Sequence, residues 1–263
     1  MRIAICGIGP AGLFAAWAAR EHDVQLFDVN VDFQPWRIFA LQYLHAHCDL
    51  PVEARRELQL HYRIDGADGW TPDQIKRAYN YKVGRPLADV NSTRFAFEHP
   101  KTVFSLKVAY SFLYGAFKDR MVGMKLNAEL LTEVFAPGFD LVISTVPLNI
   151  LFPAWPLEVS QMWITQDSAP IELQENECVM NVDPALPWTR ASRIDGGVAT
   201  EYVKDVAKWN LPPGLNLQKL RKVIKPASYP ELPKNVILAG RWGSWDPAPL
   251  SHDTYYRLSS MLE

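Results

Sequence analysis

Residues 2–28 read RIAICGIGPAGLFAAWAAREHDVQLFD, two apolar segments separated by a glycine-rich turn and an alanine-rich stretch. The segment 2–6 is short and apolar, and residues 13–20 are rich in alanine, so we expect a strand and then a helix. Residues 24–28 form a second apolar segment that ends in an acid. The order strand, glycine turn, helix, strand is typical of a βαβ unit.

The glycine turn has the spacing of a dinucleotide-binding fingerprint, GIGPAG over residues 7–12. Gly7 permits the tight turn, Gly9 lets the backbone approach a pyrophosphate, and Gly12 allows the helix to pack closely on the strand. The N–H groups at the helix N-terminus then face the phosphates. The residues assigned to this cofactor-binding turn are Gly7, Gly9, Pro10, Ala11 and Gly12.

Asp28 ends the second strand of this unit. A carboxylate at that place accepts hydrogen bonds from the ribose hydroxyls of an adenosine and repels a 2′-phosphate. The sequence therefore favours FAD or NAD over NADP as the bound dinucleotide. The alternative is a βαβ unit that binds no nucleotide.

The composition is that of an ordinary globular protein, with 48% hydrophobic and 21% charged residues. The chain carries 27 Lys and Arg against 29 Asp and Glu, which argues against a surface that follows nucleic acid throughout but leaves a local basic patch open. Three widely spaced cysteines do not suit a disulfide framework, so we expect a reducing, cytoplasmic location. No apolar run reaches the roughly 18 residues of a membrane span, and we expect no membrane partner.

Beyond residue 30 the sequence does not repeat βα units at regular spacing, as a purely parallel NAD-dependent dehydrogenase domain would. Strand patterns of the same apolar kind return at 139–147 and 235–240. We therefore predict an α/β fold with a Rossmann-like FAD-binding domain built from both chain ends and an inserted α+β substrate region. The predicted ranges are 1–34, 136–150 and 233–263 for the FAD-binding domain, and 35–135 and 151–232 for the substrate region.

Local patterns give further expectations within the inserted region. Helices are expected over 51–61, from Thr71 onward, over 104–121 and over the basic segment 217–224, strands over 178–183 and 197–203, and a hairpin or pair of strands over 79–97. The basic segment 217–224 is typical of a solvent-exposed face. It is also where the phosphate backbone of a nucleic-acid substrate would lie.

Three separated stretches resemble a flavoprotein superfamily. The first is GIGPAG at 7–12 with Asp28, where these families more often have Glu; the second is DLVISTVP at 140–147. The third is VILAGRWGSWD at 236–246, followed by SHD at 251–253. Together they are similar to the superfamily that includes amine oxidases, protoporphyrinogen oxidase and UDP-galactopyranose mutase, whose terminal Gly-Arg and aromatic pattern the third stretch resembles.

The resemblance implies non-covalent FAD, because no cysteine or histidine lies in a covalent-flavin motif. It implies that the last strand and helix touch the flavin, with the helix N-terminus stabilising the negative charge that develops on reduction. An amine-oxidase Gly-Gly-Arg motif is missing, and Arg37 is the hypothetical substitute. The further cofactor-binding residues implied by the resemblance are Arg37, Thr145, Gly240, Arg241, Ser251, His252 and Asp253.

Two arginines and a histidine are the candidates for substrate chemistry. The mutase resemblance implies that Arg190 or Arg193 clamps an anion, which suits a guanidinium; the alternative is a surface pair balanced by nearby acids. His45 is the candidate proton shuttle, or else a packing group. His45 and His47 lack a convincing third ligand, so no metal site is expected.

These observations predict an FAD-dependent oxidoreductase. The resemblance implies oxidation of an amine or amino-acid C–N bond by hydride transfer to flavin N5. One variant is a compact phage flavoprotein acting as a lyase on a glycyl-modified thymine base in DNA, leaving an aminomethyl group. The alternatives are a sugar-nucleotide isomerase like UDP-galactopyranose mutase, which the short chain disfavours, and a non-catalytic nucleotide-binding scaffold. The substrate is then a small molecule or a modified nucleobase, and nucleic acid stays open as a partner.

Overall fold

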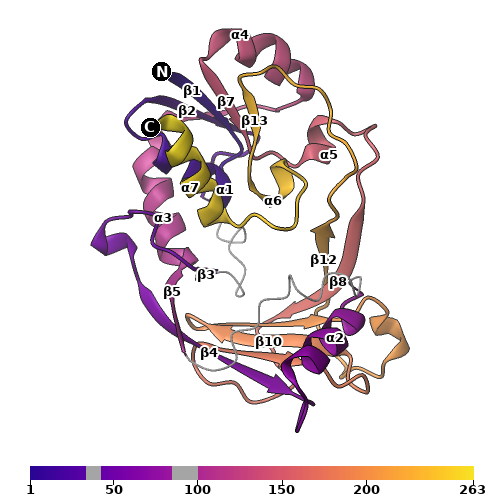
Figure 1. Cartoon of the computed structure of the whole chain (residues 1–263). Coiled ribbons are helices and arrows are strands. Elements are labelled where there is room, and N and C mark those ends of the chain that lie inside the picture. The colour runs from indigo at the N-terminus through magenta and orange to yellow at the C-terminus, as the bar shows by residue number, and fades with distance from the viewer. Residues whose placement is uncertain (34–42, 85–99) are drawn as a thin grey trace.

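The computed structural model describes residues 1–33, 43–84 and 100–263, and it contains two sheets on opposite sides of the molecule (Figure 1). The first sheet has the strand order β13-β7-β1-β2-β6, and all of its strand pairs are parallel. Its strands are β1 (Arg2–Cys6), β2 (Asp23–Asp28), β6 (Met121–Gly123), β7 (Leu141–Ser144) and β13 (Val236–Leu238). The predicted α/β class with a parallel Rossmann-like sheet is confirmed.

Helices cover both faces of the parallel sheet, because its strands are apolar on both sides. Ile3 and Ile5 of β1 point to one face, where they pack with α1 (Pro10–Ala18), α3 (Leu106–Phe117) and α7 (Ser251–Leu262). The neighbouring residues of β1 point to the other face, toward the π-helical segment η5 (Leu130–Phe135) and α4 (Ala136–Gly138).

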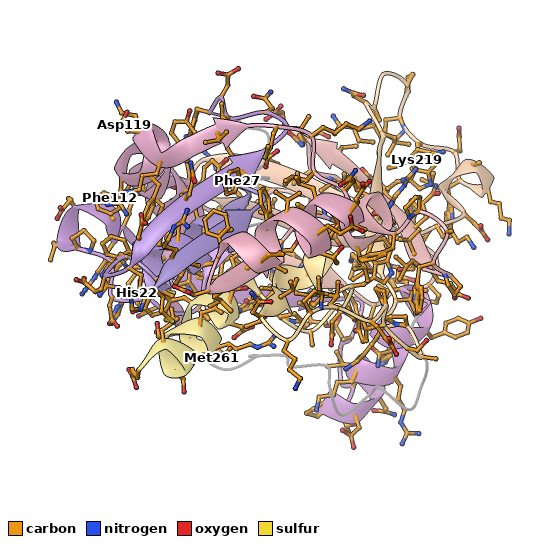
Figure 2. All side chains as sticks on the ribbon, turned by 90° about the horizontal axis from the view of Figure 1, so that it is seen from above. His22, Phe27, Phe112, Asp119, Lys219 and Met261 are labelled. Carbon is orange, nitrogen blue, oxygen red and sulfur yellow. The ribbon has the colours of Figure 1, made fainter. Side chains whose placement is uncertain are left out.

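Aromatic packing fixes the second helical layer on the sheet. Phe27 of β2, labelled in Figure 2, has its ring centroid 4.5 Å from that of Phe135 and 5.9 Å from that of Phe139. Aromatic pairs at such separations add to the stabilisation that burial supplies. The end of β2, where Asp28 lies, is thereby held in place.

The second sheet has eight strands in the order β12-β8-β11-β10-β9-β4-β5-β3, and β4 and β9 are its parallel pair. Its strands are β3 (Tyr43–Leu44), β4 (Glu57–Asp65), β5 (Lys101–Ser105), β8 (Val159–Gln166), β9 (Glu177–Asn181), β10 (Trp188–Ile194), β11 (Gly197–Tyr202) and β12 (Gln218–Val223). The remaining helical elements are α2 (Pro72–Lys82), α5 (Leu148–Leu151), α6 (Gly240–Gly243) and 3-10 turns at Val52–Ala54, Lys118–Arg120 and Val206–Lys208.

The two faces of the eight-stranded sheet differ. Val179, Ala191 and Tyr202 lie on one face, which is covered by apolar residues of the flanking loops, among them Leu173. Strand alternation puts Arg190 and Ile194 on the other face, which we call the inner face. Ile194 belongs to the same apolar cluster as Tyr43, and the ring of His45 links Tyr43 to His252 of α7. The inner face is where a site between the two halves has to be built.

The expected helix over 51–61 is wrong. The chain makes a 3-10 turn at Val52–Ala54 and then enters β4 at Glu57. Within β4, Leu58 and Leu60 are buried while their neighbours point outward, which is the two-residue period of a strand. The charges in this segment resemble a helical pattern, but the apolar residues follow the strand period.

The helix over 217–224 is also wrong, because the basic segment forms the edge strand β12, paired antiparallel with β8. Of the hairpin expected over 79–97, residues 79–82 belong instead to α2, and residues 85–99 lie outside the described residues. Helix α2 begins as expected: the Thr71 hydroxyl accepts from the Gln74 N–H, and the Gln74 side chain accepts from the Thr71 N–H.

The parallel sheet draws on more of the chain than the two ends. β6 and α3 lie within the range 35–135 that the sequence assigned to the substrate region, yet both pack with the parallel sheet. Strand β5 runs directly into α3, so this segment joins the two halves (Figure 1). Among the described residues, no helix has the length and apolar character needed to cross a bilayer.

Candidate functional site

The glycine turn between β1 and α1 is built by close backbone contacts. Gly7 has a φ of +95°, and a Cβ placed there would come within 2.6 Å of Thr145 Oγ1. A Cβ at Gly12 would lie 1.8 Å from the Gly7 carbonyl oxygen. Side chains are excluded from both positions, so these two glycines shape the turn itself.

Gly9 differs from the other two glycines, because a Cβ at this residue would meet no atom within 4 Å in the part of the chain that the structure describes. Gly9 is also the N-cap of α1, where no side chain caps the helix and no acid occurs in the first turn. Pro10 follows as the first helical residue and lacks an N–H. Among the described residues, the first turn of α1 therefore has neither a capping side chain nor an acid of its own, as a helix N-terminus that receives a pyrophosphate requires.

Asp28 lies beside this turn at the end of β2 and is 9% exposed. Its Oδ2 accepts a hydrogen bond of 2.8 Å from the Ile8 N–H, and its Oδ1 accepts a longer one from the Asn30 N–H. A carboxylate at the end of the second strand of a βαβ unit is the group that accepts from ribose hydroxyls. The residues of this half of the site fit the adenosine and pyrophosphate of FAD.

Thr145, at the end of β7, braces the turn from the neighbouring strand. Its hydroxyl lies 3.1 Å from the carbonyl oxygens of both Cys6 and Gly7, and donates to them. The Thr145 hydroxyl is therefore committed to the backbone of the turn. Its place in the structure is that of a positioning residue for the glycine turn.

The C-terminal segment closes on the same turn. Gly240, the first residue of α6, has a φ of +68°, and a Cβ there would lie 2.5 Å from the Ala11 Cβ. A Cβ at Gly243 would lie 2.6 Å from the Ser144 carbonyl oxygen. The Gly240–Gly243 segment thus contacts both α1 and β7. Half-buried Arg241 lies between these two glycines in the sequence.

We expect the Gly240→Ala variant to be less stable by about 1–3 kcal/mol, because the residue has to adopt a left-handed conformation and clears Ala11 only if α6 shifts. FAD content should fall with it, since α6 moves away from the first turn of α1. Urea unfolding and the flavin-to-protein absorbance ratio measure the two effects. A variant as stable as the wild type would contradict this reading of the α6 contact.

The first turn of α7 holds the other predicted cofactor residues. Asp253 Oδ2 accepts from the Leu250 N–H at 2.8 Å and caps the helix, while half-buried Ser251 opens it. His252 is 7% exposed, and its Nδ1 has no hydrogen-bond partner among the described residues. Burial lowers the pKa of His252, and the nearby Asp253 carboxylate only partly opposes this effect.

His45, just after β3, lies against this turn. Its ring centroid is 5.5 Å from that of His252 and 5.1 Å from that of Tyr43. The loop after His45 is fastened to the parallel half, because the Tyr255 hydroxyl donates to Asp49 at 2.8 Å. The structure therefore brings together His45 and His252, which are far apart in the sequence.

Arg190 lies on the inner face in a buried charge cluster. Its Nη2 forms an ion pair with Glu201, and Lys222 Nζ lies 3.1 Å from the other Glu201 oxygen. Burial raises the pKa of Glu201, but the two cations outweigh it and lower that pKa to about 2. Arg193 is not beside Arg190, because it points to the opposite face and pairs with exposed Glu175 at 2.9 Å.

The remaining site predictions concern Arg37 and a metal ion. Arg37 lies outside the described residues. Among the described residues, no group of three or more His, Cys, Asp or Glu side chains is arranged to hold a metal ion. Sequence reasoning missed Tyr62 and Lys222, whose alternation along β4 and β12 was the available signal for the inner face.

Comparison with solved structures identifies the fold. The chain is similar to a reduced UDP-galactopyranose mutase, with a TM-score of 0.57 and 14% identity over 99% of this chain and 93% of that one. It is similar to 2-methyl-3-hydroxypyridine-5-carboxylic acid oxygenase, with a TM-score of 0.54 and 12% identity over 100% and 82% of the two chains. A flavin-dependent halogenase from Xanthomonas campestris gives a TM-score of 0.50 and 13% identity over 99% and 70%.

No protein-family model and no curated protein matches the sequence. The structural likeness therefore shows a fold shared with flavin enzymes. FAD stays the cofactor that the glycine turn and Asp28 predict. Substrate and reaction have to be argued from this chain's own residues.

Proposed function

We propose that the chain binds FAD non-covalently and uses it to oxidise a C–N bond of an amine or amino acid. The observation that carries the FAD assignment is the first turn of α1, which has open space at Gly9, no capping side chain and Asp28 beside it. Bound FAD would supply a two-electron acceptor for the C–H bond next to nitrogen. The residues of the chain then bind the substrate, orient it and handle its protons.

Two regions are proposed to form the reaction site. Arg190 on the inner face holds an anionic group of the substrate, and His45 with His252 at the start of α7 exchanges its proton. The low pKa of His252 keeps its imidazole neutral near neutral pH, so it is able to accept a proton. The imine formed by loss of two hydrogens is cleaved by water to a carbonyl compound and an amine.

A glycyl-modified thymine in phage DNA is the most specific substrate that we propose. Its glycyl group offers a carboxylate for Arg190 and a C–N bond for oxidation. Removal of two hydrogens and addition of water would release glyoxylate and leave an aminomethyl group on the base. The protein would then meet DNA, and the cations of β12, including Lys219 and Arg221, supply the basic strip on the edge of the sheet.

The Arg190→Lys variant tests the substrate clamp. Lysine keeps the charge beside Glu201 but loses the forked geometry, so we expect KM for the amine donor to rise about 10- to 100-fold with FAD content unchanged. The matched control is Arg193→Lys, on the opposite face, which should behave as the wild type. Equal KM values for the two variants would remove Arg190 from the site.

A sugar-nucleotide isomerase is the second candidate. Support for it comes from the likeness to the mutase over 93% of that chain and from Gly240 of the terminal Gly-Arg pattern, which lies against Ala11 of α1. Anaerobic mixing separates the two functions. Bleaching of the oxidised flavin by amine-bearing nucleosides or amino acids supports oxidation, and turnover of UDP-sugars by the reduced protein supports isomerisation. FAD binding without either activity would support the scaffold alternative.

A further inference from the structure

Two tyrosine hydroxyls of the eight-stranded sheet form a hydrogen-bonded pair. Tyr43 of β3 and Tyr62 of β4 are both half-buried, and their hydroxyl oxygens are within hydrogen-bond distance of each other. They pack against buried Leu60 and Cys178. The ring of His45 lies against that of Tyr43, so the pair borders the histidines at the start of α7.

The pair belongs to the inner face that carries Arg190. Strand register places Tyr62 beside Cys178, and Cys178 beside Ser192, in one row across β4, β9 and β10. Arg190 is two residues before Ser192 on the same strand and therefore on the same face. Tyr43, Tyr62, Ser192 and Arg190 thus share one surface.

This surface carries hydrogen-bond donors that no acceptor among the described residues takes up. Burial raises the pKa values of Tyr43 and Tyr62, so both hydroxyls keep their protons near neutral pH. Their mutual hydrogen bond uses one of the two protons, which leaves the second for another acceptor. Arg190 Nε and Ser192 Oγ are buried and have no hydrogen-bond partner among the described residues.

The charges on this surface favour an anion. Arg190 and Lys222 share the single carboxylate of Glu201, so the trio carries a net positive charge. Buried polar groups in proteins are nearly always hydrogen-bonded, and donors left over on a positive surface call for an oxygen acceptor from outside the chain. A neutral apolar ligand would leave these donors unsatisfied.

We propose that the Tyr43–Tyr62 pair, together with Arg190 and Ser192, binds an anionic oxygen group of the substrate, either a carboxylate or a phosphate. The inference deepens the proposed role of Arg190 and rests on it. The spare tyrosine proton donates to one oxygen, while Arg190 and Ser192 donate to the others. The reacting part of the substrate then extends toward His45 and His252.

Isothermal titration calorimetry of the full chain with sodium acetate, inorganic phosphate and neutral acetamide tests the proposal. We expect one of the two anions to bind and acetamide not to bind, and the anion that binds identifies the group as carboxylate or phosphate. Tyr62→Phe and Tyr43→Phe should each weaken that binding about 10- to 100-fold, as loss of a hydrogen bond to a charged group predicts. The control variant is Tyr81→Phe, because Tyr81 lies on α2 and its side chain is 78% exposed.

The pH dependence separates the tyrosines from the histidines. If acetate is the anion that binds, its affinity should stay constant from about pH 6 to 8, because Arg190 and both tyrosines keep their protons there. Binding that depended on an imidazolium would instead weaken as the pH rises, and because burial lowers the pKa of His252, its imidazolium is lost at a lower pH than that of an exposed histidine. Glu201, beside Arg190, keeps its charge over this range because its pKa is about 2.

Several results would overturn the proposal. These are a wild type that binds neither anion, a Tyr62→Phe variant that binds as tightly as the wild type, or acetate affinity that follows imidazole titration. FAD content and Tm measured on each variant keep the outcomes distinct. A chain that holds no FAD but binds an anion through Tyr62 would refute the proposed function and support this inference.

Discussion

Replacing Gly9 with valine is expected to abolish FAD binding while leaving the protein folded. A Cβ at Gly9 meets no atom of the described residues within 4 Å, so the valine side chain would enter the space assigned to the pyrophosphate. Gly9 has no left-handed φ, and the cost at an N-cap is about 1 kcal/mol or less. Affinity for FAD should fall by at least about 100-fold, or about 2.7 kcal/mol.

The measurement is the FAD dissociation constant of the apoprotein, determined from the quenching of flavin fluorescence. Tm is recorded in parallel. Gly12→Ala provides the contrast, because its Cβ would lie 1.8 Å from the Gly7 carbonyl oxygen and the turn itself must deform. That variant should lose both stability and FAD, whereas Gly9→Val loses FAD alone. Undiminished FAD binding by Gly9→Val would place the cofactor elsewhere.

Replacing Glu201 with alanine is expected to have the largest effect on stability. The Glu201 side chain is 2% exposed and is the common partner of Arg190 and Lys222. Its removal leaves two cations without the carboxylate between them, which costs about 3–5 kcal/mol. For a chain of this size, Tm should fall by roughly 6–20 °C.

The control for this variant is Glu21→Ala, whose carboxylate is 84% exposed beside Arg20. We expect the free energy of unfolding to change by no more than about 0.5 kcal/mol there. Differential scanning calorimetry of both variants at one pH measures the contrast. A Glu201→Ala protein as stable as the control would show that the charge cluster contributes little to folding.

The same carboxylate predicts a pH dependence. The folded-state pKa of Glu201, about 2, lies below the ordinary glutamate value of 4.5. Its contribution to stability is therefore fully present above about pH 4.5 and is lost as the pH falls toward 2. The wild type should lose stability over this range more steeply than Glu201→Ala.

The sequence predicted the βαβ unit of residues 2–28 because each glycine there has a local steric reason. A Cβ at Gly7 or Gly12 would come too close to backbone or side-chain atoms, so glycine is required at both positions of the motif. The strands β7 and β13 were also predicted from local patterns. For these elements, local pattern and tertiary structure agree.

The eight-stranded sheet was predicted less well, because its strands are determined by partners distant in sequence. β12 has four cations in its vicinity and little local strand preference, but pairing with β8 makes it an edge strand. β4 combines a charged pattern with alternating Leu58 and Leu60, and only pairing with β5 and β9 decides between helix and strand. Such pairing energies are absent from a local pattern.

The residues of the inner face were predicted only in part, because their grouping depends on strand pairing that a local pattern does not contain. Arg190 was identified from its type and from the family resemblance, but the separation of Arg190 from Arg193 depends on strand alternation in β10. The hydrogen bond between Tyr43 and Tyr62 joins residues of two strands that are separated in the sheet by β5. No spacing in the sequence predicts that contact.

The most direct test of the account is an absorption spectrum of the purified protein, from roughly 300 to 550 nm, with identification of the cofactor released on heating. The account predicts the two visible bands of an oxidised flavin and release of free FAD, since nothing in the sequence provides a covalent attachment. A colourless protein that also fails to take up added FAD would contradict the central claim.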